Sequence, residues 1–293
     1  DLVTLITILE QTSISNLTCE LEKVFNVDAF LKAYAMDVAS GNWDDYAFNK
    51  NNFYLYHTPF TGQIEFIAYD CDNTFGVDWF GMDWTTRSVY AWANATERPL
   101  VFRILEIEEY KNRYSFYLNE LLTTVLDPVN IGPHIDSMKN LITEAALEDE
   151  FKSYDWGYSD QDFLDAFSTN DIDGHTPYVN NFIAARKSNA LDELVLNNIA
   201  PVLVNEQHQP QLPEPGEDIS ITVNAFDDIA IATVTLYYSL DSMQFSTGSL
   251  YDDGLHNDGA ANDQFYGIVL PAVVSNGYLY FHFQAVDNAG QST

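Results

Sequence analysis

Hydrophobic residues recur at helical spacing through the first two-thirds of the chain and alternate with polar ones through the last third. Near the start, Leu2, Leu5, Ile6 and Leu9 repeat every three or four residues, which predicts an amphipathic helix. The same spacing predicts further helices at residues 27–34, 98–122, 131–147 and 179–196. Asp28 is the expected N-cap of the helix predicted around residues 27–34.

Two short aromatic strands interrupt this helical pattern, at residues 52–56 and 64–69. Residues 57–62 lie between them and contain Pro59 and Gly62, which favour a turn, so the two strands should pair as a hairpin. Acidic residues precede the hairpin at 44–45 and follow it at 70–72. The sequence therefore predicts that these carboxylates meet around one hairpin.

Helical periodicity stops near residues 197–201, where prolines begin to punctuate a β pattern. Residues 218–224, 232–238 and 278–286 alternate between apolar and polar side chains. Short strands at this spacing predict an immunoglobulin-like or fibronectin-type β-sandwich. We therefore predict an α+β protein with two domains, a mostly helical one at residues 1–198 and an all-β one at residues 199–293.

The charge of the chain restricts its partners. It has 44 Asp and Glu against 12 Lys and Arg, a formal net charge of −32 over 293 residues, although 46% of the residues are hydrophobic. Such a field repels nucleic acid and anionic lipid, so we expect neither as a partner. This charge suits a saline or calcium-rich setting, where ions screen the self-repulsion of the chain. A soluble protein with an ordinary acidic surface explains it equally well. No apolar run is long enough to cross a bilayer.

Asp70 and Asp72 are the best candidates for metal ligands. In an extended backbone their carboxylates project to the same face, where they repel each other unless a cation or a proton lies between them. Oxygen ligands without a Cys/His cluster suit Mg²⁺, Mn²⁺ or Ca²⁺ better than zinc. Cys71 points to the opposite face and is expected to pack; it could pair with Cys19, or both could stay buried thiols. The competing explanation is a solvated, Asx-rich loop.

A second acidic loop lies in the β domain at residues 252–267. Asp253, Asp258 and Asp263 recur there among Gly and Asn, which is the oxygen chemistry that Ca²⁺ prefers. The loop lacks the spacing and the terminal Glu of an EF-hand, and turn-forming Asp-Gly and Asn-Asp pairs explain it equally well. Both interpretations stay open from sequence.

Residues 42–46 (NWDDY) and 51–76 (NNFYLYHTPFTGQIEFIAYDCDNTFG) carry a longer pattern. It resembles the CotH family of spore-coat-type protein kinases, in which an NYYLY strand, a P-x-T-G turn and a W-D-x-D-x-T-F-G segment follow in this order. Tyr69 stands where that family often has Trp. The resemblance extends upstream over residues 25–44 and downstream over 98–122 and 178–194, and it implies a kinase-like C-lobe with the hairpin at its active site.

By this resemblance, Asp44 matches the catalytic aspartate that orients and deprotonates the acceptor hydroxyl. Asp70 matches the aspartate that binds the metal of ATP with Mg²⁺ or Mn²⁺, and Asp72 would be a second acidic group near it. The metal-binding asparagine has two candidates. Asn49 keeps the D-x-x-x-x-N spacing, whereas Asn52 directly precedes the strand. We favour Asn52.

Nothing before Asp44 resembles a kinase N-lobe, because no glycine-rich hairpin or strand lysine occurs there; Lys23 and Lys32 are in helical contexts. We expect the N-lobe to precede Asp1. Two functions remain in view. The first is a secreted or cell-surface kinase acting on Ser/Thr of a protein substrate, with the β-sandwich positioning it or attaching it to a surface-layer partner. The second is a non-catalytic adhesive or structural surface protein that keeps the fold and a divalent-cation site.

The segment 79–92 adds one ambiguity. It holds several aromatic residues among polar ones, namely Trp79, Trp84, Tyr90 and Trp92. They could line an acceptor groove or pack into the domain.

Overall fold

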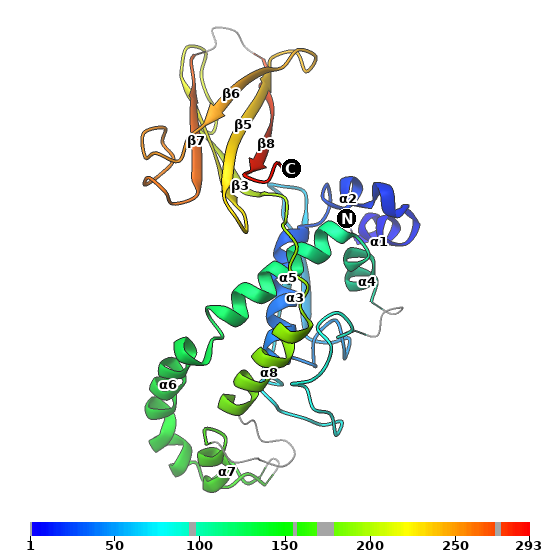
Figure 1. Ribbon diagram of the computed structural model, residues 1–293, viewed down its shortest axis with the longest axis vertical. Coiled ribbons are helices and arrows are strands. Elements are labelled where there is room, and N and C mark those ends of the chain that lie inside the picture. The colour runs from blue at the N-terminus through cyan, green and yellow to red at the C-terminus, as the bar shows by residue number, and fades with distance from the viewer. Residues whose placement is uncertain (1, 94–97, 155–156, 169–178, 273–276) are drawn as a thin grey trace. The chain divides into compact units, whose positions relative to one another are not determined.

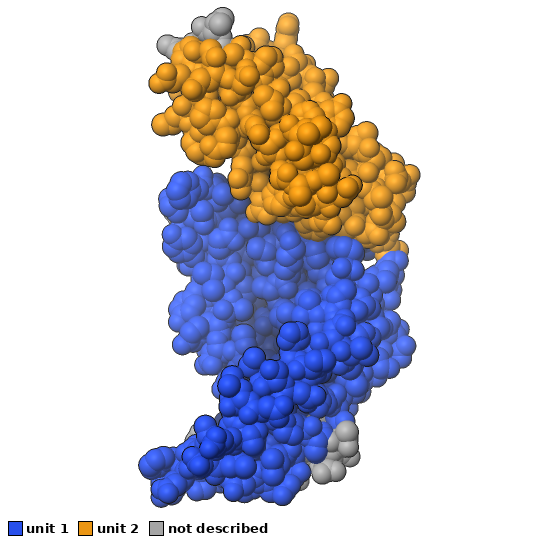
Figure 2. All heavy atoms as spheres, turned by 90° about the vertical axis from the view of Figure 1, so that its left-hand side faces the viewer, with its two compact units in different colours: residues 1–196 blue, residues 197–293 orange. Residues whose placement is uncertain are grey.

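The computed structural model describes residues 2–93, 98–154, 157–168, 179–272 and 277–293. The chain divides into two compact units, residues 1–196 and residues 197–293, coloured separately in Figure 2. Within the described residues, the first unit consists of helices, one hairpin and the loops that join them, and the second unit consists of antiparallel sheets. The protein is therefore of the α+β class.

The first unit begins with helices α1 (Leu2–Gln11), α2 (Ile14–Leu21) and α3 (Val27–Ser40). Helix α3 is the central one, and its apolar face is fully buried. Its N-cap is Asn26, whose side chain accepts the backbone N–H of Ala29 at 3.0 Å. The predicted cap was therefore wrong: Asp28 lies in the first turn and forms an ion pair with Lys32 at 2.8 Å.

The predicted hairpin is confirmed. Strands β1 (Phe53–His57) and β2 (Ile64–Ala68) pair antiparallel, with Leu55 opposite Phe66. Ile64 and Phe66 are buried against α3, and Ile64 also bridges to Phe25 just before that helix. The hairpin therefore has one packed face, which fixes where its two ends deliver their polar residues.

The remaining helices of this unit are α4 (Pro99–Leu105), α5 (Glu108–Thr123), α6 (Pro128–Glu148), α7 (Asp160–Asp165) and α8 (Val179–Glu193). The single helix predicted over 98–122 is thus two helices, because the chain breaks at 106–107. Helices α3, α5 and α8 contact one another and form the packed centre (Figure 1). Part of the Asp-rich stretch at 155–173 lies outside the described residues.

The second unit contains strands β3 (Val202–Gln209), β4 (Ile219–Phe226), β5 (Ile231–Ser239), β6 (Ser246–Leu250), β7 (Phe265–Leu270) and β8 (Tyr280–Asp287). They form two antiparallel sheets of order β3-β4-β7 and β6-β5-β8. Alternating residues of both sheets, including Ile221, Val223 and Leu236, make one apolar core. Strands β3, β6 and β7 were not predicted.

Candidate functional site

The site begins where α3 ends. Gly41 takes the left-handed conformation (φ +72°) that terminates the helix, and the next residue turns back onto it. The backbone N–H of Asn42 donates to the Asp37 carbonyl at 2.8 Å, and its Nδ2 donates to Asp37 Oδ1 at 2.9 Å. Trp43 then anchors the loop by donating its indole N–H to the Val77 carbonyl at 2.8 Å.

Burial alternates along this loop. Trp43, Asp45 and Ala47 are buried, whereas Asp44 is half-buried and lies on the other side of the backbone. The alternation gives two consecutive aspartates opposite environments. Asp44 faces a group of polar side chains, while Asp45 faces the interior.

Four asparagines surround the Asp44 carboxylate. Asn52 donates to its Oδ2 at 2.9 Å, and Asn49 donates to its Oδ1 in a short hydrogen bond. Asn51 and Asn73 approach the same carboxylate at 3.4 Å each. The first three belong to the loop before β1, and Asn73 comes from the segment after β2. Both candidates for the metal-binding asparagine therefore meet Asp44, so geometry does not choose between them.

The acidic residues after the hairpin reach this group in different ways. Asn73 Nδ2, which approaches Asp44, also donates to Asp72 Oδ1 at 2.8 Å, so one amide joins two carboxylates. Asp70 is exposed, with a left-handed φ of +52°, and its backbone carbonyl accepts from Asn52 Nδ2 at 3.5 Å. We call Asp44, Asn49, Asn52, Asp70, Asp72 and Asn73 the Asp44 cluster.

The segment after the hairpin is tied back to α3. The backbone N–H of Phe75 donates to the Ser40 carbonyl at 2.8 Å, and Thr74 Oγ1 donates to the Cys71 carbonyl at 3.1 Å. Cys71 itself is exposed, so its expected packing role was wrong. Cys71 and Cys19 are both free and exposed, so they form neither a disulfide nor a pair of buried thiols in this structure.

The donor set of the Asp44 cluster fits a hard cation that arrives with its own ligands. Within the described part of the chain no group of three or more His, Cys, Asp or Glu is arranged to hold a metal. The cluster offers carboxylate and amide oxygens only. Mg²⁺ ordinarily keeps several waters and is bound by one or two carboxylates together with substrate phosphates. The residues therefore fit a nucleotide-borne Mg²⁺ or Mn²⁺ better than a metal held by protein alone.

Two more carboxylates lie behind the cluster in the interior. Burial raises the pKa of Asp37 to about 6, although the hydrogen bond from Asn42 opposes the shift. Burial and the negative charge of Asp37 raise the pKa of Asp45 well above its usual range. The hydroxyl of Tyr34, also buried, has its pKa raised by burial and by these two acids. The expectation that Asp45 joins the other carboxylates around the hairpin was therefore wrong, because its side chain is buried in the interior. Sequence reasoning gave Asp37 and Tyr34 no role, although they share helical spacing with buried Phe30.

The tryptophans at the end of segment 79–92 pack. Trp84 and Trp92 are buried, and Trp84 stacks on Trp43 with ring centroids 6.1 Å apart. Trp79 and Phe80 at its start are 45% and 50% exposed. Arg186 is also buried and donates to backbone carbonyls, including that of Val38 at 3.0 Å, so it has a structural role.

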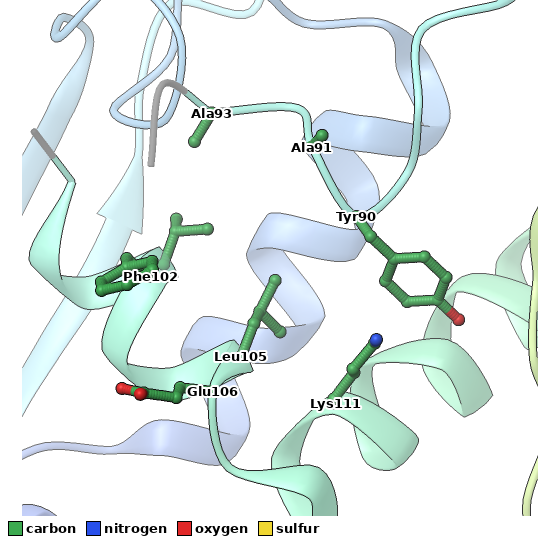
Figure 3. Close-up of a pocket in the computed structure, with 8 residues that line it drawn as sticks. Tyr90, Ala91, Ala93, Phe102, Leu105, Glu106 and Lys111 are labelled. Atoms are coloured by element: carbon green, nitrogen blue, oxygen red, sulfur yellow. The ribbon is translucent and has the colours of Figure 1, made fainter. Parts of the chain in front are cut away.

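A separate hollow of about 300 Å³ lies between α4, the start of α5 and residues 90–93 (Figure 3). Its lining is mostly apolar, and Phe102 and Leu105 are among the residues that form it. Lys111 lies over the Tyr90 ring with its Nζ 4.5 Å from the centroid. None of the lining residues belongs to the Asp44 cluster, so the hollow is not part of this site.

The acidic loop of the second unit uses its carboxylates to organise its own backbone. Asp258 accepts the N–H groups of Asp253 at 2.8 Å, Gly254 at 3.0 Å and His256 at 3.0 Å. Burial raises the pKa of Asp258, but these backbone donors outweigh it and the net shift is downward. Asp263 likewise accepts from Ala260 at 2.8 Å. These bonds account for the turns, and calcium binding there stays a prediction.

In the parts of the chain that the structure describes, no helix is both long and apolar enough to cross a membrane. This agrees with the sequence, in which no apolar run of that length occurs.

Comparison with known proteins places this chain in a family. The family described as CotH kinase protein matches residues 1–190, which contain the whole Asp44 cluster. The chain is also 29% identical over 136 residues to the inner spore coat protein H of Bacillus subtilis (strain 168). That alignment covers 46% of this chain and 36% of the relative, so the chain spans well under half of the relative's length. Because the family match includes more than half of the chain, this protein belongs to the CotH kinase protein family.

Proposed function

We propose that this protein is a CotH-type protein kinase that transfers the γ-phosphoryl group of ATP to Ser or Thr hydroxyls of a protein at or outside the cell surface. The observation that carries the proposal is the Asp44 cluster. A half-buried carboxylate is held by asparagines from its own loop and is joined through Asn73 to Asp72 beyond the hairpin. An aspartate base beside asparagine and aspartate metal ligands is one part of the arrangement that phosphoryl transfer uses in kinases, and this supports the proposal.

Asp44 is the proposed base. It would orient the acceptor hydroxyl and take its proton while the hydroxyl oxygen bonds to the γ-phosphorus and the bond to the β–γ bridging oxygen breaks. The amides of Asn49 and Asn52 fix the plane of the carboxylate, so that it need not reorganise when the hydroxyl arrives.

Asp70 and Asn52 are the proposed holders of the nucleotide's Mg²⁺ or Mn²⁺, with Asp72 and Asn49 in support. The bound cation would neutralise charge on the phosphates as it develops. Asp70 occupies a left-handed backbone position, which is uncommon for residues other than glycine, although Asp adopts it more readily than most. Strain of this kind is concentrated at functional sites.

We propose that the second unit is an immunoglobulin-like accessory module that positions the kinase or attaches it to a surface-layer partner. It contains twelve Asp or Glu residues and no Lys or Arg. A unit of this charge repels polyanions. It therefore suits a protein or cation-bridged partner and not nucleic acid.

A second candidate function is a non-catalytic surface or adhesive protein that keeps the cation site. One observation favours it. The two lysines before Asp44 both form ion pairs with acidic residues three or four positions earlier, Lys23 with Glu20 and Lys32 with Asp28, at 2.8 Å each. Within residues 2–44 neither lysine lies on a strand, which is where a kinase carries the lysine that holds the phosphates.

The two functions differ in phosphoryl transfer. The protein, expressed from its complete gene, would be incubated with γ-labelled ATP, Mn²⁺ or Mg²⁺ and a set of Ser/Thr-containing coat or surface proteins. The kinase proposal predicts label on Ser or Thr with wild type, and none with Asp44→Asn or Asp70→Asn. If wild type binds Mn²⁺ but transfers no phosphate, the result would favour the second candidate.

A further inference from the structure

Asp45 directly follows the proposed base and has the opposite environment. Only 2% of its surface is exposed, whereas Asp44 is half-buried and bonds to asparagine amides. Asp45 Oδ1 accepts the backbone N–H of Phe48 at 2.7 Å. Its own carbonyl accepts the backbone N–H of Asn51 at 3.0 Å. One buried residue therefore closes the loop through both its side chain and its backbone.

The residues that this loop presents are the ones that hold Asp44. Asn49 lies within the loop and Asn52 directly follows it, and both donate to the Asp44 carboxylate. The loop reaches β1 through two left-handed residues that are not glycine, Lys50 at φ +66° and Asn52 at φ +50°. Such backbone is uncommon away from glycine, more so for Lys than for Asn, and it needs a constraint from its surroundings. The two bonds to Asp45 supply that constraint.

The neighbours of Asp45 show what its carboxyl contributes. Its Oδ2 has no hydrogen-bond partner among the described residues, and neither has the nearby Tyr34 hydroxyl. Burial and the negative charge of Asp37 raise the Asp45 pKa. The charge of Asp45 in turn raises the pKa of Arg87, although burial lowers that pKa overall. The interior thus favours the uncharged acid. The useful atom is Oδ1 as an acceptor, and a neutral amide of the same shape can supply it.

We propose that Asp45 is a positioning residue for the Asp44 site, which closes the 45–51 loop so that Asn49 and Asn52 meet the Asp44 carboxylate. The inference rests on the proposed function for its catalytic meaning, but its structural content can be tested without turnover. Asp45 itself touches neither the nucleotide nor the acceptor in this account.

Amide hydrogen exchange of peptides covering residues 45–52 tests the loop directly. Asp45→Ala leaves the Phe48 N–H without its acceptor, so exchange there should rise about five- to 150-fold, which is the loss of one buried hydrogen bond expressed as a ratio. Asp45→Asn keeps an acceptor oxygen and should exchange like wild type. The matched control is Asp44→Asn, the same substitution one residue earlier, which should leave the exchange of the Phe48 amide unchanged.

Phosphoryl transfer then shows whether the loop serves the site. We expect Asp45→Ala to lower kcat and also to raise the KM for ATP, because it misplaces both the base and the two metal-holding amides of the loop, Asn49 and Asn52. Asp45→Asn should keep most of the wild-type rate. Asp44→Asn should abolish transfer although its loop stays ordered. A rescue by amide but not by alanine is not expected of a residue that only fills space.

Several results would overturn the proposal. One is an Asp45→Ala variant whose Phe48 amide exchanges at the wild-type rate. Another is an Asp45→Asn variant whose Phe48 amide exchanges as fast as in Asp45→Ala. If Asp45→Ala does not fold, Asp45→Asn decides alone, since faster loop exchange or a large loss of rate in that variant contradicts the account. If wild type transfers no phosphate, the proposed function fails, while the exchange comparison still decides whether Asp45 closes the loop.

Discussion

Gly41 offers a sharp test of how α3 is joined to the site loop. It has φ +72°, and a Cβ added there would lie 3.0 Å from Phe182 Cε2 and closer still to its Cζ. Phe182 belongs to α8 and is fully buried, so its ring has little room to move. Gly62 in the hairpin turn has almost the same φ, +73°, but a Cβ added there would meet nothing within 4 Å. The two glycines share the backbone strain and differ in the contact.

The magnitudes follow from these two contributions. An L-residue in left-handed backbone costs about 1–2 kcal/mol. Replacing glycine also restricts the unfolded chain, which returns about 0.4–1 kcal/mol at either position. Forcing a methyl into a packed region costs about 1–3 kcal/mol more. We therefore expect Gly41→Ala to lower the free energy of unfolding by about 1–3 kcal/mol more than Gly62→Ala does, since only the first variant meets the packed ring.

Tryptophan fluorescence during guanidinium unfolding isolates the relevant unit, because all five tryptophans lie within residues 1–196. A third variant, Gly41→Ala with Phe182→Leu, tests the cause, since the smaller side chain should recover part of the loss specific to Gly41→Ala. Equal losses in the two glycine variants would refute the reasoning. The reasoning would also fail if the losses from Gly41→Ala and Phe182→Leu simply added in the double variant.

Three further predictions concern buried charge. Because the Asp37 pKa is raised to about 6, the folded state binds more protons than the unfolded one between about pH 4 and 6, so stability falls as pH rises through that window; Asp37→Asn should flatten this dependence in pH-resolved unfolding. Arg186→Met should lower the free energy of unfolding by at least about 3 kcal/mol, because it leaves buried carbonyls unpaired. Lys187→Met, one residue later, loses one ion pair to Asp127 and should lower it by about 0–1 kcal/mol. Denaturant unfolding measures both. Asp258→Asn should destabilise the second unit, as seen by tyrosine near-ultraviolet dichroism, and should abolish any rise in Tm with Ca²⁺ if that loop binds calcium.

Local pattern predicted those parts of the structure that local chemistry decides. The hairpin followed from alternating aromatic residues around a Pro–Gly turn, and the helical segments from spacing. Failures occurred where a tertiary contact made the choice. Asn26 caps α3 although Asp28 is an equally good cap by residue type, and the Asn26 amide also donates to Glu65 on β2 at 3.1 Å. Strand β6 reads STGSL, which has almost no apolar signal and gains its place by pairing with β5.

The Asp44 cluster shows the same division. The order of motifs predicted Asp44, Asp70 and Asp72 as site residues, the D-x-x-x-x-N spacing predicted Asn49, and the position just before the strand predicted Asn52. The bridging role of Asn73 could not be predicted, because it joins Asp44 across 29 residues and depends on how the hairpin returns. The burial of Asp45 was missed as well, since two adjacent aspartates look alike in sequence and are separated only by the packing of their neighbours.

The central claim is that the Asp44 cluster binds a nucleotide with its metal. The most direct measurement is thermal unfolding of the protein expressed from its complete gene, followed by tryptophan fluorescence, with ATP and Mn²⁺ added together and separately. A ligand at 100 times its Kd adds about 2.7 kcal/mol to stability, which is a shift of a few degrees for a unit of this size. The account predicts such a shift in wild type and its loss in Asp70→Asn. No shift with ATP and Mn²⁺, or an equal shift in Asp70→Asn, would contradict it.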